Sequence, residues 1–184
     1  MFGNSTQFNF DLLDNINRLV KDEYDLLQSK MELDDEIFNQ SNCQCETERY
    51  EFIFDRKVKK DFQTGFKNIG YELVIAGLYK QCELHLKNVV TLEFRNISKT
   101  KINEYASLRS ELADFEAIDE LRLINNSIKH QGKVSSSLAA AYSHWIVDTD
   151  LGDLSDTYER LKNKVRNYII EHESHLKEES KKFV

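Results

Sequence analysis

The apolar residues near the N-terminus recur at intervals of three and four, which is the period of an α-helix. This spacing predicts a first helix that begins near Gln7 and reaches Met31, with its charged residues on the opposite side. The run DDEIFNQSNCQCET, residues 34–47, is acidic and then polar, and we interpret it as a loop. The apolar positions of this helix are Leu12, Ile16, Leu19, Val20, Leu27 and Met31.

The next segment, RYEFIFDRKVKKDF over residues 49–62, fits two structures. Its aromatic residues alternate as in a strand, and some of them also fit a helix, so a hairpin stays open; we favour a helix because no strand partner is visible. Residues 62–94 then show helical spacing. Gly65, Gly70 and Gly77 lie within them and indicate either a break or places where another helix crosses closely.

The C-terminal half reads as further helices separated by short loops. After a connection at 95–100 we predict a helix over 101–113 and another that ends at His130 or Gln131, because Gly132 suits a left-handed residue after a helix. A loop follows, with one helical turn near 138–142. Asp153 is expected to cap a last helix whose tail is exposed. The buried stripe of that helix is Leu154, Tyr158, Leu161, Val165 and Ile169.

Composition supports an all-α fold. The 184 residues include no proline and only 6 glycines, so the usual helix breakers are nearly absent. We expect an up-and-down bundle of about five to six helices in a single domain, residues 1–184.

Charge and cysteine usage narrow the class of protein. The formal net charge is −7, so no overall basic field draws the chain to DNA or to anionic lipid. Three cysteines without framework spacing fit a reducing compartment. Because no leader segment and no apolar run of about 18 residues occurs, we expect a cytoplasmic protein with no membrane contact.

Most kinds of reactive site are not supported by the sequence. Cys43 and Cys45 have no second close pair, and His172 and His175 lie in a charged segment expected to face solvent, so no metal site is predicted. We expect His85 and His144 to lie at the edge of the core. Phosphate-binding glycine loops and nucleophile elbows are absent, and no cofactor is expected.

One stretch, LRLINNSIKHQG over residues 121–132, has reactive residue types at a useful spacing. On a helix, Arg122, Asn126 and His130 form a polar stripe that points away from the apolar residues Ile118, Leu121, Ile124 and Ile128. RNA carries its own nucleophile, the 2′-hydroxyl. His130 would exchange the proton, Asn126 would position the phosphate, and Arg122 or Lys129 would neutralise charge on it.

A purely structural explanation of the same residues is also possible. Lys129 and His130 in a last helical turn interact favourably with the helix dipole. An Asn-Asn-Ser sequence on an exposed face needs no further explanation. Spacing alone therefore leaves both readings open.

At NNSIKH the chain resembles the HEPN superfamily (higher eukaryotes and prokaryotes nucleotide-binding). The family motif is an arginine, a polar residue, a few variable positions and a histidine on a late helix. Asn126 matches the polar position and His130 the histidine. Catalytic members carry arginine where this chain has Asn125; the nearest arginine, Arg122, lies one turn earlier.

The resemblance implies a small helical bundle that binds or cleaves RNA without metal, as in toxin-antitoxin and other defence systems. In active members two motifs meet across a dimer, which implies a homodimer, RNA in a composite groove that includes Lys129 and Asn125, and an antitoxin or other protein partner. Because position 125 is not arginine, a second reading is a catalytically inactive HEPN-like binding or sensor module that acts through protein partners.

Overall fold

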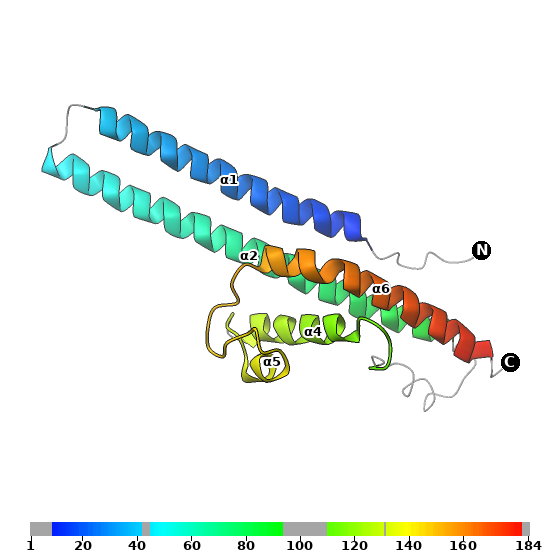
Figure 1. Ribbon diagram of the computed structural model, residues 1–184. Helices are drawn as coiled ribbons and strands as arrows, with labels where there is room; N and C mark the ends of the chain where they lie inside the picture. The colour runs from blue at the N-terminus through cyan, green and yellow to red at the C-terminus, as the bar shows by residue number, and fades with distance from the viewer. Residues whose placement is uncertain (1–8, 42–44, 94–109, 131, 182–184) are drawn as a thin grey trace. The chain divides into compact units, whose positions relative to one another are not determined.

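The structure, a computed structural model, describes residues 9–41, 45–93, 110–130 and 132–181. These residues form only helices and loops, apart from an isolated antiparallel bridge between Lys133 and Asp150, so the predicted all-α helical bundle is confirmed. The predicted start at Gln7, the connection at 95–100 and residues 101–109 of a predicted helix lie outside the described residues. The helices are α1 (Phe10–Gln40), α2 (Glu46–Glu93), α4 (Phe115–His130), α5 (Ser136–Ala141) and α6 (Leu154–Lys181) (Figure 1).

Residue contacts divide the chain into two compact units. The hairpin unit, residues 11–73, contains α1 and the first part of α2. The C-terminal unit comprises residues 74–184 together with 1–10, so that its helices are the second part of α2 and α4 to α6. A single domain over residues 1–184 stays a prediction.

In the hairpin unit, α1 and the first part of α2 run antiparallel (Figure 1). The loop predicted over residues 34–47 is wrong for its first half, because α1 continues to Gln40. Asp34 forms an ion pair with Lys59 at 2.9 Å, and Asp35 forms one with Arg56 at 2.5 Å. Since both cations lie on α2, these acidic residues hold the end of α1 in helical form instead of opening a loop.

The segment at 49–62 is helical throughout, which settles the choice between helix and hairpin in favour of the helix. The neighbouring glycines do not break α2 either. A Cβ atom at Gly70 would lie 2.6 Å from Cγ2 of Val20, so glycine is required there for α1 to approach. A Cβ at Gly65 would meet nothing within 4 Å.

The core of the C-terminal unit lies around α4, which contacts both α5 and α6. Gly132 has a φ of 67° and donates its backbone N–H to the Ser127 carbonyl, so α4 ends at His130 as predicted. The predicted cap of α6 is also confirmed, because the Asp153 carboxylate accepts the Ser155 backbone N–H at 2.9 Å. The five residues predicted as the buried stripe of α6 are all buried.

The prediction of an exposed tail, with a solvated His172 and His175 pair, is wrong. His172 and Leu176 are almost fully buried. They follow Tyr168 at intervals of four residues, so they continue the buried face of α6 by one more turn. No described helix is long and apolar enough to cross a membrane.

Candidate functional site

The polar stripe of α4 is only partly open to solvent. Arg122 and Asn126 are half-buried, whereas Lys129 and His130 are exposed in the last turn. Asn125 is 1% exposed, and its Nδ2 atom has no hydrogen-bond partner among the described residues. The structure therefore brings Arg122, Asn126, Lys129 and His130 onto one side of the helix and turns Asn125 into the interior.

The charge of Arg122 is already matched by a neighbouring carboxylate. Its Nη2 and Nε atoms donate to Oδ1 of Asp119 at 2.6 and 3.1 Å. Asp119 is in turn bonded at 3.3 Å by the Tyr142 hydroxyl, whose pKa is raised first by burial and then by the Asp119 charge. The guanidinium group therefore points toward the N-terminal end of α4. Its backbone position is also eight residues from His130, or about 12 Å along the axis.

Lys129 faces the neighbouring part of α2. Its Nζ atom lies 6.0 Å from the centre of the Tyr79 ring. The pKa of Glu83 is lowered, mainly by a hydrogen bond from Lys80, with a contribution from the charge of Lys129. His130 makes no hydrogen bond or ion pair with any described residue. The end of α4 thus offers an imidazole to solvent beside a cation that already has partners on α2.

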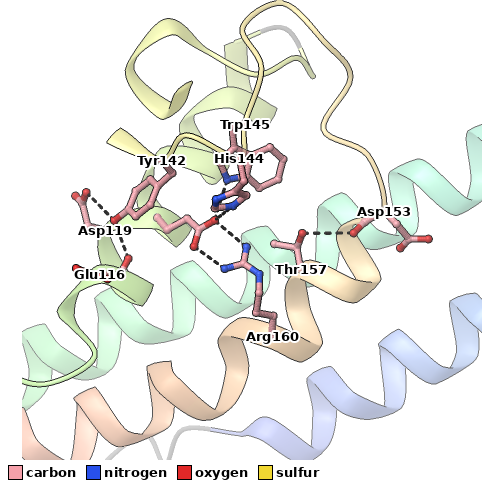
Figure 2. A network of polar contacts seen from close by, with 9 residues as sticks. Glu116, Asp119, Tyr142, His144, Trp145, Asp153, Thr157 and Arg160 are labelled. Atoms are coloured by element: carbon pink, nitrogen blue, oxygen red, sulfur yellow. Dashed lines mark hydrogen bonds and ion pairs between the residues drawn. The ribbon is translucent and has the colours of Figure 1, made fainter. Parts of the chain in front are cut away.

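A second polar cluster, which the sequence did not indicate, is centred on the buried carboxylate of Glu120. Figure 2 labels the three residues that surround it, His144, Trp145 and Arg160. Arg160 of α6 donates to both of its oxygens at 2.7 Å. Trp145 donates its indole N–H at 2.8 Å, and Nε2 of His144 lies 2.9 Å away. These contacts join α4, the loop after α5, and α6.

The Glu120 cluster keeps its carboxylate ionised. Burial raises the pKa of Glu120, but hydrogen bonds from Arg160 and Trp145 and the charge of Arg160 outweigh burial, so the pKa lies below its ordinary value. Three of these contacts reach Oε1 and one reaches Oε2, and the Glu120 side chain is only 4% exposed, so the carboxylate is largely closed to a substrate. The one sequence feature that could have indicated this cluster is the position of Glu120 itself, an acidic residue on the apolar side of α4 one turn before Ile124.

The expected edge histidines both bind carboxylates. His144 is bonded to Glu120, and Nε2 of His85 lies 2.5 Å from Oε1 of Glu173 on α6. Among the residues that the structure describes, no three His, Cys, Asp or Glu side chains are grouped to hold a metal ion. Cys43 lies outside these residues, and burial raises the pKa of the Cys82 thiol to about 12, so that thiol stays protonated.

The most extensive unusual surface lies on the hairpin unit. Large apolar side chains there are exposed on one side of the α1–α2 pair, which we call the apolar face. A groove of about 470 Å³ between the helices is lined by Ile16 and Val20 from α1 and by Phe62, Phe66 and Ile69 from α2. Four exposed residues of α2 line this groove, and Leu33 of α1 lines a second hollow between the helices together with Phe62. The exposed members of the apolar face are Leu12, Leu19, Leu26, Leu33, Ile37, Phe54, Val58, Phe62, Phe66, Ile69 and Leu73.

Comparison of the chain with protein families, with curated proteins and with solved structures finds no match. The resemblance to the HEPN superfamily therefore stays a prediction. The function has to be argued from the two surfaces just described, the end of α4 and the apolar face.

Proposed function

We propose that this chain is a non-catalytic, HEPN-like helical binding module that acts through protein contacts. The observation that carries this proposal is the apolar face of the hairpin unit. Scattered apolar residues are normal on a protein surface, but a contiguous patch of this size is typical of an interaction site. In the part of the chain that the structure describes, no helix is suited to crossing a membrane, so a protein is the partner we consider.

The polar stripe on α4 supports the same proposal, because its residues are poorly suited to catalysis. A ribonuclease of the proposed kind needs a cation near the scissile phosphate. Arg122 is bound to Asp119, and Asn125, where the resemblance places a catalytic arginine, is a neutral and buried amide. The two positions best placed to supply that charge therefore do not offer a free guanidinium.

Site-specific photo-cross-linking in cells tests the proposal on the full chain. A photoreactive residue replaces Leu26, which is exposed on the apolar face, and the matched control replaces Ile170, which is exposed on α6. We expect a cross-linked protein product from position 26 and little or none from position 170. Equal yields at the two positions, or no product at position 26, would contradict a docking role for the apolar face.

Metal-independent RNA cleavage is the second candidate, and the exposure of Lys129 and His130 favours it. His130 would accept the proton of a 2′-hydroxyl while Asn126 holds the phosphate. The 2′-oxygen would then displace the 5′-oxygen of the next nucleotide from phosphorus, giving a cyclic phosphate and a 5′-hydroxyl that takes its proton from water. A second copy would complete the groove, and an antitoxin would be the protein partner. Incubation of total RNA with the protein in chelator tests this candidate: fragments that disappear with His130→Ala and persist with His175→Ala support it.

A further inference from the structure

We infer that the apolar face binds a second copy of this chain, with α1 of one copy lying antiparallel to α1 of the other. This inference rests on the proposed function, because it names the partner of the same surface. Four leucines on α1, Leu12, Leu19, Leu26 and Leu33, are spaced at intervals of seven. Apolar residues at this spacing form the seam along which two helices pack as a coiled coil.

Two charges interrupt the seam, and they have opposite signs. Glu23 and Lys30 lie on the same side of α1 as the leucines, seven residues or about 10 Å apart along the axis. Side chains at this separation do not pair within one helix. Neither residue has an ion pair within the described part of the chain, although Lys30 borders a hollow of about 280 Å³ between the helices. Both charges would therefore find a partner on another molecule.

An antiparallel second copy supplies those partners, and a parallel one does not. Around the midpoint between residues 23 and 30, the two-fold axis of a symmetric dimer places each Glu23 near Lys30 of the other copy. A parallel pair would place Glu23 near Glu23. The same midpoint sets Ile16 opposite Ile37 and brings Leu19 to within one residue of Leu33, so apolar residues of the two copies also meet on both sides of the axis.

Apolar residues in the first part of α2 are arranged symmetrically about the same two-fold axis. Arg56 donates to the Met31 carbonyl and Gln63 to the Tyr24 carbonyl, so residues 56–63 lie beside residues 24–31. The midpoint on α2 therefore falls near residue 60. Around that position Val58 stands opposite Phe62, and Phe54 stands opposite Phe66. Both helices thus carry a self-complementary apolar pattern centred at the same level of the hairpin.

The size of the apolar face suits a stable dimer. Its exposed large side chains each offer on the order of 100 Å², so about 1,000 Å² per copy becomes available, against about 800 Å² per partner in a standard interface. These side chains are between 36% and 69% exposed.

The acidic character of α1 does not oppose this arrangement. Nine acidic and three basic residues give α1 a net charge of −6. Asp34 and Asp35 are paired with cations of α2. Asp22 and Glu36 lie one turn from the leucines and flank them. The other remaining acidic residues, apart from Glu23, fall on the side of α1 opposite the leucines, about 10 Å across the helix. At that distance the repulsion between exposed charges is largely screened by salt.

Charge reversal tests the inference on the full chain by sedimentation velocity over a range of protein concentrations. We expect a dimer for the wild type. E23K alone and K30E alone each place two like-charge pairs in the dimer, so each weakens dimerisation by about tenfold or more. An equimolar mixture of the two variants restores dimers, and so does the double variant E23K/K30E. The controls K21E and D25K change the same kinds of charge on the other side of α1 and leave the dimer unchanged.

The outcomes separate the partner from the docking function. The inference that the partner is a second copy is overturned if the wild type is monomeric. It is also overturned if neither the mixture nor the double variant recovers the dimerisation lost in the single charge reversals. If position 26 then cross-links to a protein of another mass, the docking function still holds. A monomeric wild type without any cross-link overturns both. Helical circular dichroism checks that each variant folds, and the mixture keeps the test valid if one variant is partly destabilised.

Discussion

The two units use their apolar residues in opposite ways. In the C-terminal unit, one side of α6 is buried along its length from Leu154 to Leu176, and the described exposed large apolar residues are few. In the hairpin unit the described buried apolar side chains are Leu13, Val20, Met31 and Tyr71, whereas thirteen large apolar residues are exposed. One unit therefore buries most of its own large apolar side chains, and the other leaves most of them exposed.

The contacts that hold each unit together also differ, because polar contacts join the hairpin helices and an apolar core holds the C-terminal unit. The hairpin unit is joined by ion pairs such as Lys59 with Asp34, by the buried Gln63, and by stacking of Phe38 on Phe52 at 3.9 Å. The C-terminal unit places one buried carboxylate, Glu120, inside an apolar core. Polar contacts thus position the hairpin while leaving its apolar face uncovered.

The largest effect is expected from removing the buried carboxylate. Glu120→Ala leaves Arg160 and the Trp145 N–H without their acceptor, and should lower the free energy of unfolding by about 2–4 kcal/mol. Urea unfolding followed by fluorescence measures this change, because Trp145 is the single tryptophan. The control Arg122→Ala removes a partly exposed pair within one helix and should cost under about 1 kcal/mol. Equal losses in the two variants would mean that the Glu120 cluster does not hold the C-terminal unit.

A smaller loss is expected at the helix crossing in the hairpin unit. Gly70→Ala inserts a Cβ at 2.6 Å from Val20 and should destabilise the hairpin by about 1–3 kcal/mol. Gly65→Ala meets open space in the same helix and should instead stabilise it by about 0.5–1 kcal/mol through helix propensity. Thermal unfolding followed by circular dichroism compares the two. A similar effect of both changes would contradict the close approach of α1 to Gly70.

Periodicity predicted helix content well, because the spacing of apolar residues depends only on local geometry. The buried stripe of α6, the αL residue at Gly132 and the cap at Asp153 were all readable for that reason. The end of α1 was not, since Asp34 and Asp35 are held by cations more than twenty residues away. The Glu120 cluster was missed for the same reason, because the partners of Glu120 come from two other segments, the loop after α5 and α6.

Exposure was the other quantity that periodicity could not provide. Leu161 and Leu19 occupy similar apolar stripes in sequence, yet Leu161 is 1% exposed and Leu19 is 59% exposed. An apolar stripe in the sequence predicts which side of a helix is apolar, but it does not predict what covers that side. The candidate stripe on α4 shows the same limit, because spacing aligned Arg122 with His130 and gave no sign that Asp119 already binds the arginine.

The two units should also respond to pH in opposite directions. The pKa of Glu120 is lowered in the folded protein, so its contribution to stability is present above the ordinary value of 4.5 and is lost as pH falls through the folded pKa. The pKa of Lys59 is raised, first by its hydrogen bonds to Asp55 and Asp34. Its contribution is present below 10.5 and is lost as pH rises through the folded pKa.

Urea midpoints measured across pH check this contrast. Trp145 fluorescence should report an acid-side loss that Glu120→Gln removes. Lys59→Met should flatten the alkaline side and leave the acid side unchanged. A common pH profile in the wild type and both variants would show that neither group sets the pH dependence.

The smallest effect on folding is expected where the apolar face is open. Leu19→Gln and Ile170→Gln each replace a side chain that is more than half exposed, so each should change the free energy of unfolding by under about 0.5 kcal/mol when measured in dilute protein. The two variants should differ in association instead. Leu19→Gln weakens binding at the apolar face, because it removes buried apolar area from the complex, whereas Ile170→Gln leaves binding intact. If Leu19→Gln were strongly destabilising in dilute protein, Leu19 would belong to the core of the hairpin unit, and the contrast between the two units would disappear.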